Sequence, residues 1–192
     1  MTVKQSAAPA DHQEQDSDGP ISGLNVETDL GNFAFTLNTR LAPYTCAYFH
    51  DLAASGTLDN SAIFRIVSPK NTIGLNASTD IEVVQIGTRH AMDQQRDAVV
   101  HEPTNTTGLR HRQWTVSAAR FEVGELYQSF FICMRDEPSL DFGGERSPDG
   151  RGFAAFGEVV SGFDTLLRAF SLAEDNELLS QNISVHRVTP MK

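Results

Sequence analysis

Residues 62–67 place one charged residue, Arg65, among Ile, Phe and Val side chains that favour a buried β-strand. A charge on such a strand is most often solvated on the outward face of the sheet. The alternative is a cleft, where an arginine is a fixed cationic donor because its guanidinium does not lose its proton. Arg65 is therefore the first candidate for chemistry, and the rest of the chain must decide between the outward face and the cleft.

Three histidines and one acidic residue recur in a long, charged stretch at residues 87–111: His90, His101, Glu102 and His111. They could converge on a metal ion. Their spacing, however, matches none of the compact zinc patterns. Solvated loop histidines are the better interpretation, and the sequence predicts no metal site.

Two further patterns that resemble known sites have simpler interpretations. Gly143-Gly144 and Pro148-Asp149-Gly150 lack the following helix and the lysine of a phosphate-binding loop, so turns are predicted. Ser117 and Ser129 lie on predicted strands without the Gly-x-Ser-x-Gly turn of a nucleophilic serine. A catalytic triad is therefore not expected.

Length and charge restrict the class of protein. The chain has 192 residues, 40% of them hydrophobic, which suits one domain with a sizeable core. Its 15 Lys and Arg residues against 25 Asp and Glu residues give a net charge of −10. This balance argues against nucleic acid or an anionic membrane as the main partner. No stretch approaches the ~18 consecutive apolar residues of a membrane span.

The cysteines and the N-terminus bear on the compartment. Cys46 and Cys133 each lie in an apolar segment and are predicted to be buried thiols in a reducing compartment. A single disulfide in a periplasmic protein is the alternative. The N-terminus lacks a charged region followed by an apolar one, as a signal peptide would have. We therefore expect a cytoplasmic protein, or a periplasmic one if a leader has been removed.

The chain divides into a tail and one folded domain. Residues 1–20 are rich in Ala, Gln, Ser, Asp and Glu without apolar periodicity, which predicts a disordered tail. Residues 21–192 form the domain. Loops are expected at 68–80, 87–111 and 140–152, the second of them over the surface near the site. Strands are expected at residues 24–28, 32–37, 62–67, 81–86, 114–119, 129–134, 153–160 and 182–188.

Two amphipathic helices separate these strands. The first follows Pro43 and stops at Gly56, and the second starts near Asp164, which favours the positive end of the helix dipole. About eight mostly antiparallel strands with two helices are typical of a mainly β fold, a closed antiparallel β-barrel capped by the helices. The core-facing residues are expected to be Cys46, Phe49, Leu52 and Ala53 in the first helix and Phe163, Leu166, Leu167 and Phe170 in the second.

Six short motifs occur in order along the domain, and several contain the residues discussed above. They are Ala42-Pro43 with the helix around Phe49, Ile63-Phe64-Arg65-Ile66-Val67, Val83-Val84-Gln85-Ile86-Gly87, Val116-Ser117-Ala118-Ala119-Arg120, Ser129-Phe130-Phe131-Ile132 and Phe156-Gly157-Glu158-Val159-Val160-Ser161-Gly162-Phe163-Asp164.

From about Leu24 to the C-terminus, these six motifs resemble those of the cyclophilin family of peptidyl-prolyl isomerases. No single motif is decisive, but six in the same order are specific. Glu102, the stretch 108–111 and the stretch 140–144 look most like bacterial cyclophilin-like proteins with a lengthened loop after the arginine strand.

The resemblance implies a β-barrel with a peptide groove on its surface and no cofactor. It implies that proline-containing peptides or unfolded protein clients are the partners, that cyclosporin-type ligands are a further class, and that the protein is a monomer. By position, it implies that Arg65, Gln85 and Phe131 are catalytic and that Val83, Ala119, Arg120, Ser129, Leu140 and Phe153 bind the substrate.

The chemistry of X-Pro bonds suits an arginine. Amide resonance sets a barrier of about 18–20 kcal/mol to rotation. Twisting the bond localises the lone pair on the proline nitrogen, so a cationic donor aimed at that nitrogen binds the twisted state more strongly than the planar one. Arg65 would then act without any covalent intermediate.

Four residues depart from the family pattern. Ser129 stands where the family usually has Gln, and Ile86 replaces the first glycine of Gln-Gly-Gly. Phe153 takes the place of an aromatic or His groove residue, and Val83 a place often held by Met. We expect weakened turnover or altered peptide choice. The alternative is a catalytically weak or inactive proline-peptide-binding module on the same barrel.

Overall fold

The computed structural model describes residues 22–72, 80–88 and 96–191. The tail predicted at 1–20 lies outside these residues, as do parts of the loops predicted at 68–80 and 87–111. In the described part of the chain, no helix is long and apolar enough to span a membrane.

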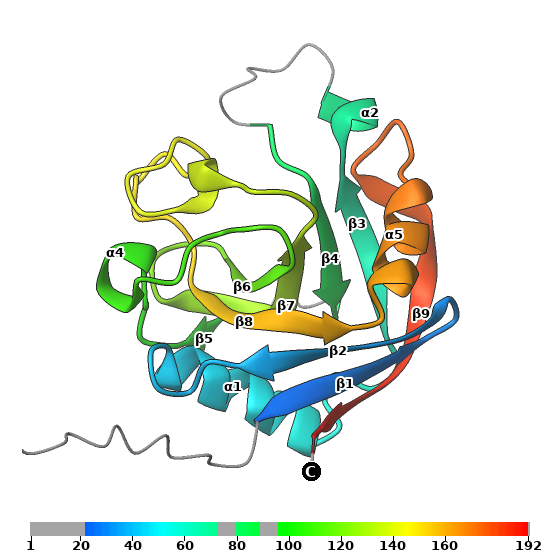
Figure 1. The fold of residues 1–192 in the computed structure, drawn as a ribbon, viewed down its shortest axis with the longest axis horizontal. Helices are drawn as coiled ribbons and strands as arrows, with labels where there is room; N and C mark the ends of the chain where they lie inside the picture. The colour runs from blue at the N-terminus through cyan, green and yellow to red at the C-terminus, as the bar shows by residue number, and fades with distance from the viewer. Residues whose placement is uncertain (1–21, 73–79, 89–95, 192) are drawn as a thin grey trace, which may run out of the picture.

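The described strands form one antiparallel sheet that closes into a barrel (Figure 1). The order is β4-β3-β9-β1-β2-β8-β6-β7, and pairing of β4 with β7 closes the ring, while β5 pairs with the first two residues of β7. Closure leaves the eight barrel strands without a free edge. The strands are β1 (Gly23–Thr28), β2 (Gly31–Leu37), β3 (Ser61–Val67), β4 (Val83–Gly87), β5 (Asp97–Ala98), β6 (Thr115–Arg120), β7 (Glu125–Cys133), β8 (Ala155–Ser161) and β9 (Leu178–Pro190).

Two longer helices, α1 (Pro43–Ala54) and α5 (Phe163–Ser171), cover different sides of the barrel (Figure 1). The predicted barrel of about eight strands with two helices is thus confirmed. Short elements also occur outside the predicted strands and helices. A side chain closes one of these turns, since Asn71 Oδ1 accepts from the backbone N–H of Ser68 at 2.9 Å. These elements are α2 (Pro69–Thr72), α4 (Thr104–Thr107), β5 and the 3₁₀ turn η1 (Pro138–Leu140).

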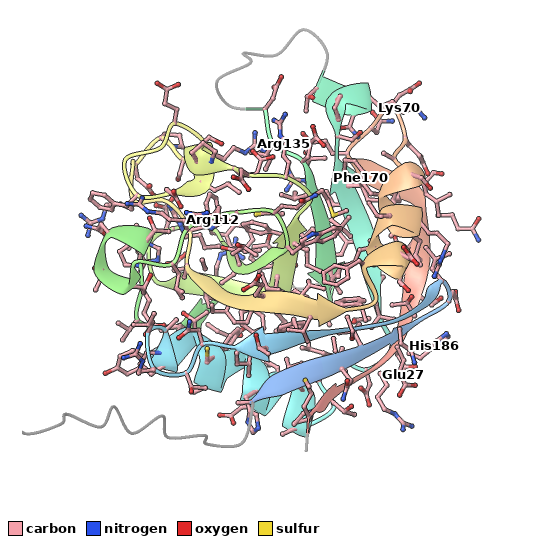
Figure 2. All side chains as sticks on the ribbon, viewed as in Figure 1. Glu27, Lys70, Arg112, Arg135, Phe170 and His186 are labelled. Atoms are coloured by element: carbon pink, nitrogen blue, oxygen red, sulfur yellow. The ribbon has the colours of Figure 1, made fainter. Side chains whose placement is uncertain are left out.

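Aromatic rings fill the barrel and hold α1 against it. Phe49 of α1 stacks on Phe156 with ring centroids 4.6 Å apart and meets Phe130 edge-on at 5.7 Å. Figure 2 shows side chains packed between the strands, whereas the labelled Lys70 and His186 lie at the outside. The main core therefore depends on a few large rings contributed by α1, β7 and β8.

The core-facing side of α5 was predicted only in part. Leu166 is buried as expected, but Phe163 and Leu167 are 38% and 49% exposed, and Ala169 takes the inward position instead. The buried side of the helix is rotated toward Thr165, Leu166 and Ala169, and Phe163 packs edge-on against Trp114 with 5.0 Å between ring centroids. In α1, by contrast, the predicted residues are buried, with Leu52 half-buried.

The long connection before β6 fastens α1 in place. The N-terminus of α1 has no capping side chain of its own. Glu102 supplies the cap from a distance: its carboxylate accepts from the backbone N–H of Tyr44 at 3.2 Å and of Thr45 at 2.8 Å, and from the Thr45 hydroxyl at 2.6 Å. A carboxylate also suits the positive end of a helix.

Both cysteines are buried and unpaired, as the reduced-thiol interpretation requires. Burial raises the pKa of Cys46 to about 12, and it raises the pKa of Cys133 as well. The two thiols therefore stay protonated near neutral pH and behave as small apolar groups.

The aromatic contact between α1 and the barrel predicts a large effect on stability. Replacing Phe49 with Ala should lower the free energy of unfolding by about 3–5 kcal/mol, because it removes a buried ring and leaves a cavity. Tyr44→Ala on the same helix is the matched control, since Tyr44 is 57% exposed and should cost under about 0.5 kcal/mol. Chemical denaturation of the two variants measures the difference, and equal losses would contradict the packing described here.

Candidate active site

A bulge in β3 turns Arg65 away from the main core. The pairing register shifts between Ile63 and Arg65 on both neighbours, β4 and β9, so Phe64 is an extra residue in the strand. Ile63 packs in the main core, whereas Val67, two residues after Arg65, belongs to a second apolar cluster. Arg65 and Val67 thus share the face opposite Ile63, which regular alternation would not give.

Arg65 opens onto a small cavity of about 120 Å³. That is the space of about four water molecules, enough for a small ring. The cleft interpretation of Arg65 is therefore confirmed and the outward face is excluded. The cavity is lined by Arg65, Ile81, Val83, Gln85, Ala119, Arg120, Tyr127, Phe131, Leu140, Arg146 and Phe153.

Strand pairing aligns the central residues in one row across the sheet. Arg65 on β3 pairs with Gln85 on β4, Gln85 pairs with Phe131 on β7, and Phe131 pairs with Ser117 on β6. Neighbouring strands are about 4.8 Å apart, so the register alone brings a cation, an amide and a ring side by side. The closure of the barrel between β4 and β7 is what completes this row.

Two acceptors hold the guanidinium of Arg65. Its Nη1 donates to Gln85 Oε1 at 3.0 Å, and its Nε and Nη2 both donate to Glu177 Oε2, at 2.9 and 2.5 Å. A guanidinium has five N–H donors. Within the described residues, these three contacts leave two N–H groups, one on each terminal nitrogen, without an acceptor.

Gln85 is fixed in turn by two hydroxyl groups. Its Nε2 donates to the Tyr127 hydroxyl at 2.7 Å and to Ser129 Oγ at 3.1 Å, and Ser129 Oγ donates to the carbonyl of Ile86 at 2.9 Å. Ser129 is fully buried and does not line the cavity. Its contact with the site runs through Gln85. Ile86 faces the main core, so its side chain also stays away from the cavity.

The apolar wall is built from rings and aliphatic side chains. Phe131 meets Phe153 edge-on with centroids 5.6 Å apart. Leu140, Val83 and Phe131 belong to the second apolar cluster, which is separate from the main core. The wall thus offers a dry surface opposite the polar side formed by Arg65 and Gln85.

Arg120 is a rigid part of the rim. Its Nε donates to the carbonyl of Gly152 at 2.8 Å, and its Nη2 donates to Ser147 Oγ at 2.9 Å and Asp149 Oδ1 at 2.8 Å. The hydrogen bond from Arg120 lowers the pKa of Asp149 to about 2. Among the described residues, Ala119 next to it has no partner in the register of β6 with β7 or β8, which leaves an irregular stretch of backbone beside the cavity.

A buried hydrogen-bonded chain lies behind Phe131. Asp141 is an acceptor, so His111 Nδ1 donates to its Oδ1 at 2.8 Å, and His111 Nε2 then accepts from Ser117 Oγ at 2.8 Å. The His111 ring stacks on Phe131 with centroids 6.3 Å apart. The sequence predicts no catalytic triad, yet the structure contains a hydrogen-bonded Ser-His-Asp chain. Ser117 is fully buried, however, so the chain supports the wall and has no access to a substrate.

The residues considered for a metal have other contacts. His111 is part of the buried chain, Glu102 caps α1, and His101 Nε2 lies 3.1 Å from the carbonyl of Arg151. His90 lies outside the described residues. No group of three or more metal-ligating side chains occurs in the part of the chain that the structure describes.

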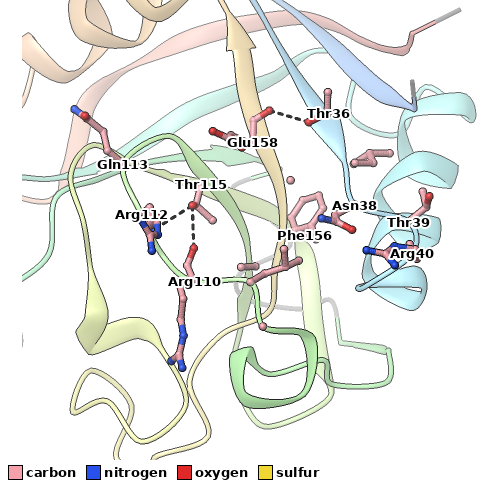
Figure 3. A pocket seen from close by; sticks show the side chains of 15 residues that line it. Thr36, Asn38, Thr39, Arg40, Arg110, Arg112, Gln113, Thr115, Phe156 and Glu158 are labelled. Carbon is pink, nitrogen blue, oxygen red and sulfur yellow. Dashed lines mark hydrogen bonds between the residues drawn. The ribbon is translucent and has the colours of Figure 1, made fainter. Parts of the chain in front are cut away.

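A larger cavity of about 580 Å³ lies at the other end of β6 (Figure 3). Arg40, Arg110, Arg112 and Glu158 line it, and the Thr115 hydroxyl holds its loop by donating to the carbonyl of Arg110 at 3.1 Å. None of the residues predicted for the site borders this space. The smaller cavity has Phe131, Leu140 and Phe153 in its lining, and these side chains suit an apolar ring.

Most residues that line the cavity were predicted from the sequence, but four residues at the site were not. Eight of the nine predicted site residues line it, and Ser129 lies behind the wall. Glu177, Tyr127, Ile81 and Arg146 were not predicted. Each reaches the site from a segment without a motif, and only tertiary contacts reveal it.

Comparisons with known proteins give one family. Residues 23–190 match the family described as cyclophilin type peptidyl-prolyl cis-trans isomerase/CLD. The chain is 27% identical over 147 residues to peptidyl-prolyl cis-trans isomerase cyp18 of Streptomyces antibioticus, a match that covers 76% of this chain and 81% of that protein. It is also 27% identical over 159 residues to peptidyl-prolyl cis-trans isomerase A of Dickeya dadantii, covering 82% and 76%.

Solved structures agree in fold. A cyclophilin type peptidyl-prolyl cis-trans isomerase of Cryptosporidium parvum superposes with a TM-score of 0.69 at 17% identity, over 90% of this chain and 98% of that one. A second structure of that protein, in the presence of the dipeptide Ala-Pro, gives a TM-score of 0.68 at 18% identity, over 88% and 99%.

The buried His111 predicts a loss of stability in mild acid. Burial lowers the pKa of His111 below its usual value of about 6.5. Below that value the unfolded chain binds a proton that the folded protein excludes, so the free energy of unfolding should fall as pH drops from 7.5 to 5.5, by at most about 1.4 kcal/mol per pH unit.

His111→Gln is the matched control for this prediction, because glutamine can donate to Asp141 and accept from Ser117 without titrating. Denaturation of both proteins at pH 7.5 and 5.5 measures the effect. The pKa of His101 is also lowered by burial, but that residue is common to both proteins. The same pH dependence in the variant and in the wild type would rule out His111 as the source.

Proposed function

Because this chain belongs to the cyclophilin-type peptidyl-prolyl cis-trans isomerase family, we propose that its Arg65 cavity binds the proline of an X-Pro peptide and lowers the barrier to rotation about that bond. The observation that carries the proposal is a cation beside an apolar wall in a cavity the size of a small ring, with two of its N–H groups left over by the acceptors in the described part of the chain. The family is one of isomerases, and the bacterial relatives carry that name.

The two sides of the cavity would have different tasks. Phe131, Leu140 and Phe153 would hold the proline ring by apolar contact, which fixes one side of the bond. The irregular backbone at Ala119 would hold the peptide on the other side. Rotation of the carbonyl then twists the amide while the ring stays in place. The contacts on both sides hold the bound peptide in the orientation that this rotation needs.

Arg65 would act on the twisted amide. In the planar bond the nitrogen lone pair is delocalised and accepts poorly, whereas in the twisted bond it becomes an acceptor. A remaining N–H of Arg65 would donate to it only then, so the interaction favours the transition state over the ground state. A hydrogen bond to a charged group contributes about 1.5–3 kcal/mol, which corresponds to roughly 10- to 150-fold in rate.

Proline-containing peptides and unfolded clients with X-Pro bonds are the proposed substrates. The neighbour from Cryptosporidium parvum has a structure in the presence of the dipeptide Ala-Pro, which supports a proline ligand in this fold. We also propose a reduced, cytoplasmic environment, since both cysteines are buried thiols. The mechanism needs no cofactor, because a guanidinium and an apolar wall supply everything that bond rotation requires.

One observation favours a second function, a proline-peptide-binding module without turnover. The Arg65 charge is partly compensated by Glu177 in the same contact, which weakens its pull on the proline nitrogen. Titrating a labelled Ala-Pro peptide while exchange spectroscopy follows its cis and trans forms distinguishes the two functions. We expect faster exchange on binding. Binding with unchanged exchange would favour the module.

The isomerase proposal predicts a specific loss in an Arg65 variant. Arg65→Ala should reduce kcat/KM on an X-Pro peptide by about 100-fold, the usual loss when one preorganised donor is removed. A protease-coupled assay measures it. Arg187→Ala, which removes an exposed arginine on β9, is the matched control and should keep the wild-type rate.

Equal rates for the wild type and Arg65→Ala would remove the enzymatic proposal. Circular dichroism should show that both variants fold, and Arg65→Lys provides a second test. Lysine keeps the charge but not the planar fork of donors, so its rate should lie between those of alanine and arginine.

A further inference from the structure

Glu177 contacts one edge of the Arg65 guanidinium from outside the cavity lining. It precedes β9 on the connection from α5. Its carbonyl accepts from the backbone N–H of Ile66 at 2.8 Å, and the next residue, Leu178, pairs with Arg65. The backbone of Glu177 is thus tied to β3 directly beside Arg65.

The connection that carries Glu177 is itself anchored. Asn71 Nδ2 donates to the carbonyl of Glu174 at 3.0 Å, and Lys70 Nζ donates to the carbonyl of Ala173 at 2.9 Å. The Glu174 carboxylate accepts from the backbone N–H of Ser180 at 3.1 Å. Contacts from α2 therefore hold the start of the segment, and the Glu174 carboxylate ties it to β9, so the Glu177 carboxylate is presented from an anchored segment.

The carboxylate contacts the guanidinium along one edge. Glu177 Oε2 accepts from Nε at 2.9 Å and from Nη2 at 2.5 Å, with the two side chains 22% (Arg65) and 30% (Glu177) exposed. Because Gln85 takes one N–H of Nη1 from the other side, the plane of the guanidinium is held at two separated points. The orientation of the two remaining donors is thereby determined.

Glu177 also offsets the repulsion between two like charges. Arg146 lines the same small cavity as Arg65, and burial together with the charge of Arg65 lowers the pKa of Arg146, while Glu177 acts in the opposite direction. Without the carboxylate, Arg65 would be repelled by Arg146 and held by Gln85 alone. Arginine has many rotamers, so a guanidinium held at one point would adopt other orientations for part of the time.

We propose that Glu177 is the positioning residue of this enzyme, holding the Arg65 guanidinium so that its free donors face the cavity. The inference rests on the proposed isomerase function. Glu177 partly compensates the Arg65 charge, but it also orients the Arg65 donors. The orientation matters more, because a donor that points elsewhere contributes nothing to the twisted amide.

Steady-state kinetics on an X-Pro peptide test the proposal. Glu177→Ala should lower kcat about 10-fold with little change in KM, since the apolar wall that binds the ring is intact. Glu177→Gln should recover part of this loss, because its amide oxygen still accepts from Nε and Nη2. Asp175→Ala is the matched control: it removes an equally charged, exposed residue from the same segment and should keep the wild-type kcat.

The orientation of the Arg65 guanidinium can be measured without an activity assay. In ¹⁵N spectra of selectively labelled protein, the Arg65 Nε–H signal should be protected from exchange in the wild type and in Asp175→Ala, and lose protection in Glu177→Ala. A wild-type kcat in Glu177→Ala, an equal drop in Asp175→Ala, or a Glu177→Gln rate at or below that of alanine would overturn the proposal.

The spectra also separate this inference from the isomerase proposal. If the wild type is no faster than Arg65→Ala, the proposed function fails, and the Nε–H signal still reports on Glu177. Protection that persists in Glu177→Ala would then refute its positioning role independently of any rate.

Discussion

A cation can stand beside an apolar cavity only where protein acceptors replace the water it has lost, and this requirement governs the site. Arg65 meets it with Glu177 on one edge and Gln85 on the other. Both acceptors come from strands or strand ends next to β3. The guanidinium therefore keeps its charge while part of its fork stays free, and the arrangement requires a barrel that brings β4 and β9 to the two sides of one strand.

The barrel supplies the opposite wall through the same register. Pairing carries the row from Arg65 through Gln85 to Phe131, and behind the ring the buried chain of Ser117 and His111 supports it. A polar chain in this position is stable because every member has a partner. Arg65, Gln85 and Phe131 are thus parts of one sheet, and strand spacing sets their separation, whereas Leu140 and Phe153 reach the wall from outside the strands.

Many of the strands and site residues could be predicted from local sequence patterns. The alternation of apolar residues predicted the strands, and Arg65, Gln85, Phe131 and Leu140 lie within short motifs whose order carries the family resemblance. Glu177 could not be found in this way, because its contact with Arg65 spans 112 positions and depends on the bulge in β3. The inward face of α5 was misjudged for a related reason: periodicity identifies an apolar side, but the packing partner selects which residues of that side are covered.

Ser129, one of the departures from the family pattern, changes the hydrogen bonds that hold the Gln85 amide but leaves that amide fixed. Both N–H groups of the Gln85 amide have acceptors, one of them the Tyr127 hydroxyl and the other Ser129 Oγ, and its oxygen accepts from Arg65. A flipped amide would face Arg65 with donors, so this network permits one orientation. The short side chain of Ser129 is therefore compensated by Tyr127, a residue two positions earlier on the same face of β7. The Tyr127 hydroxyl accepts from Gln85 Nε2, which the short Ser129 side chain alone would hold less firmly. The Gln85 oxygen therefore stays directed at Arg65 as a neutral acceptor.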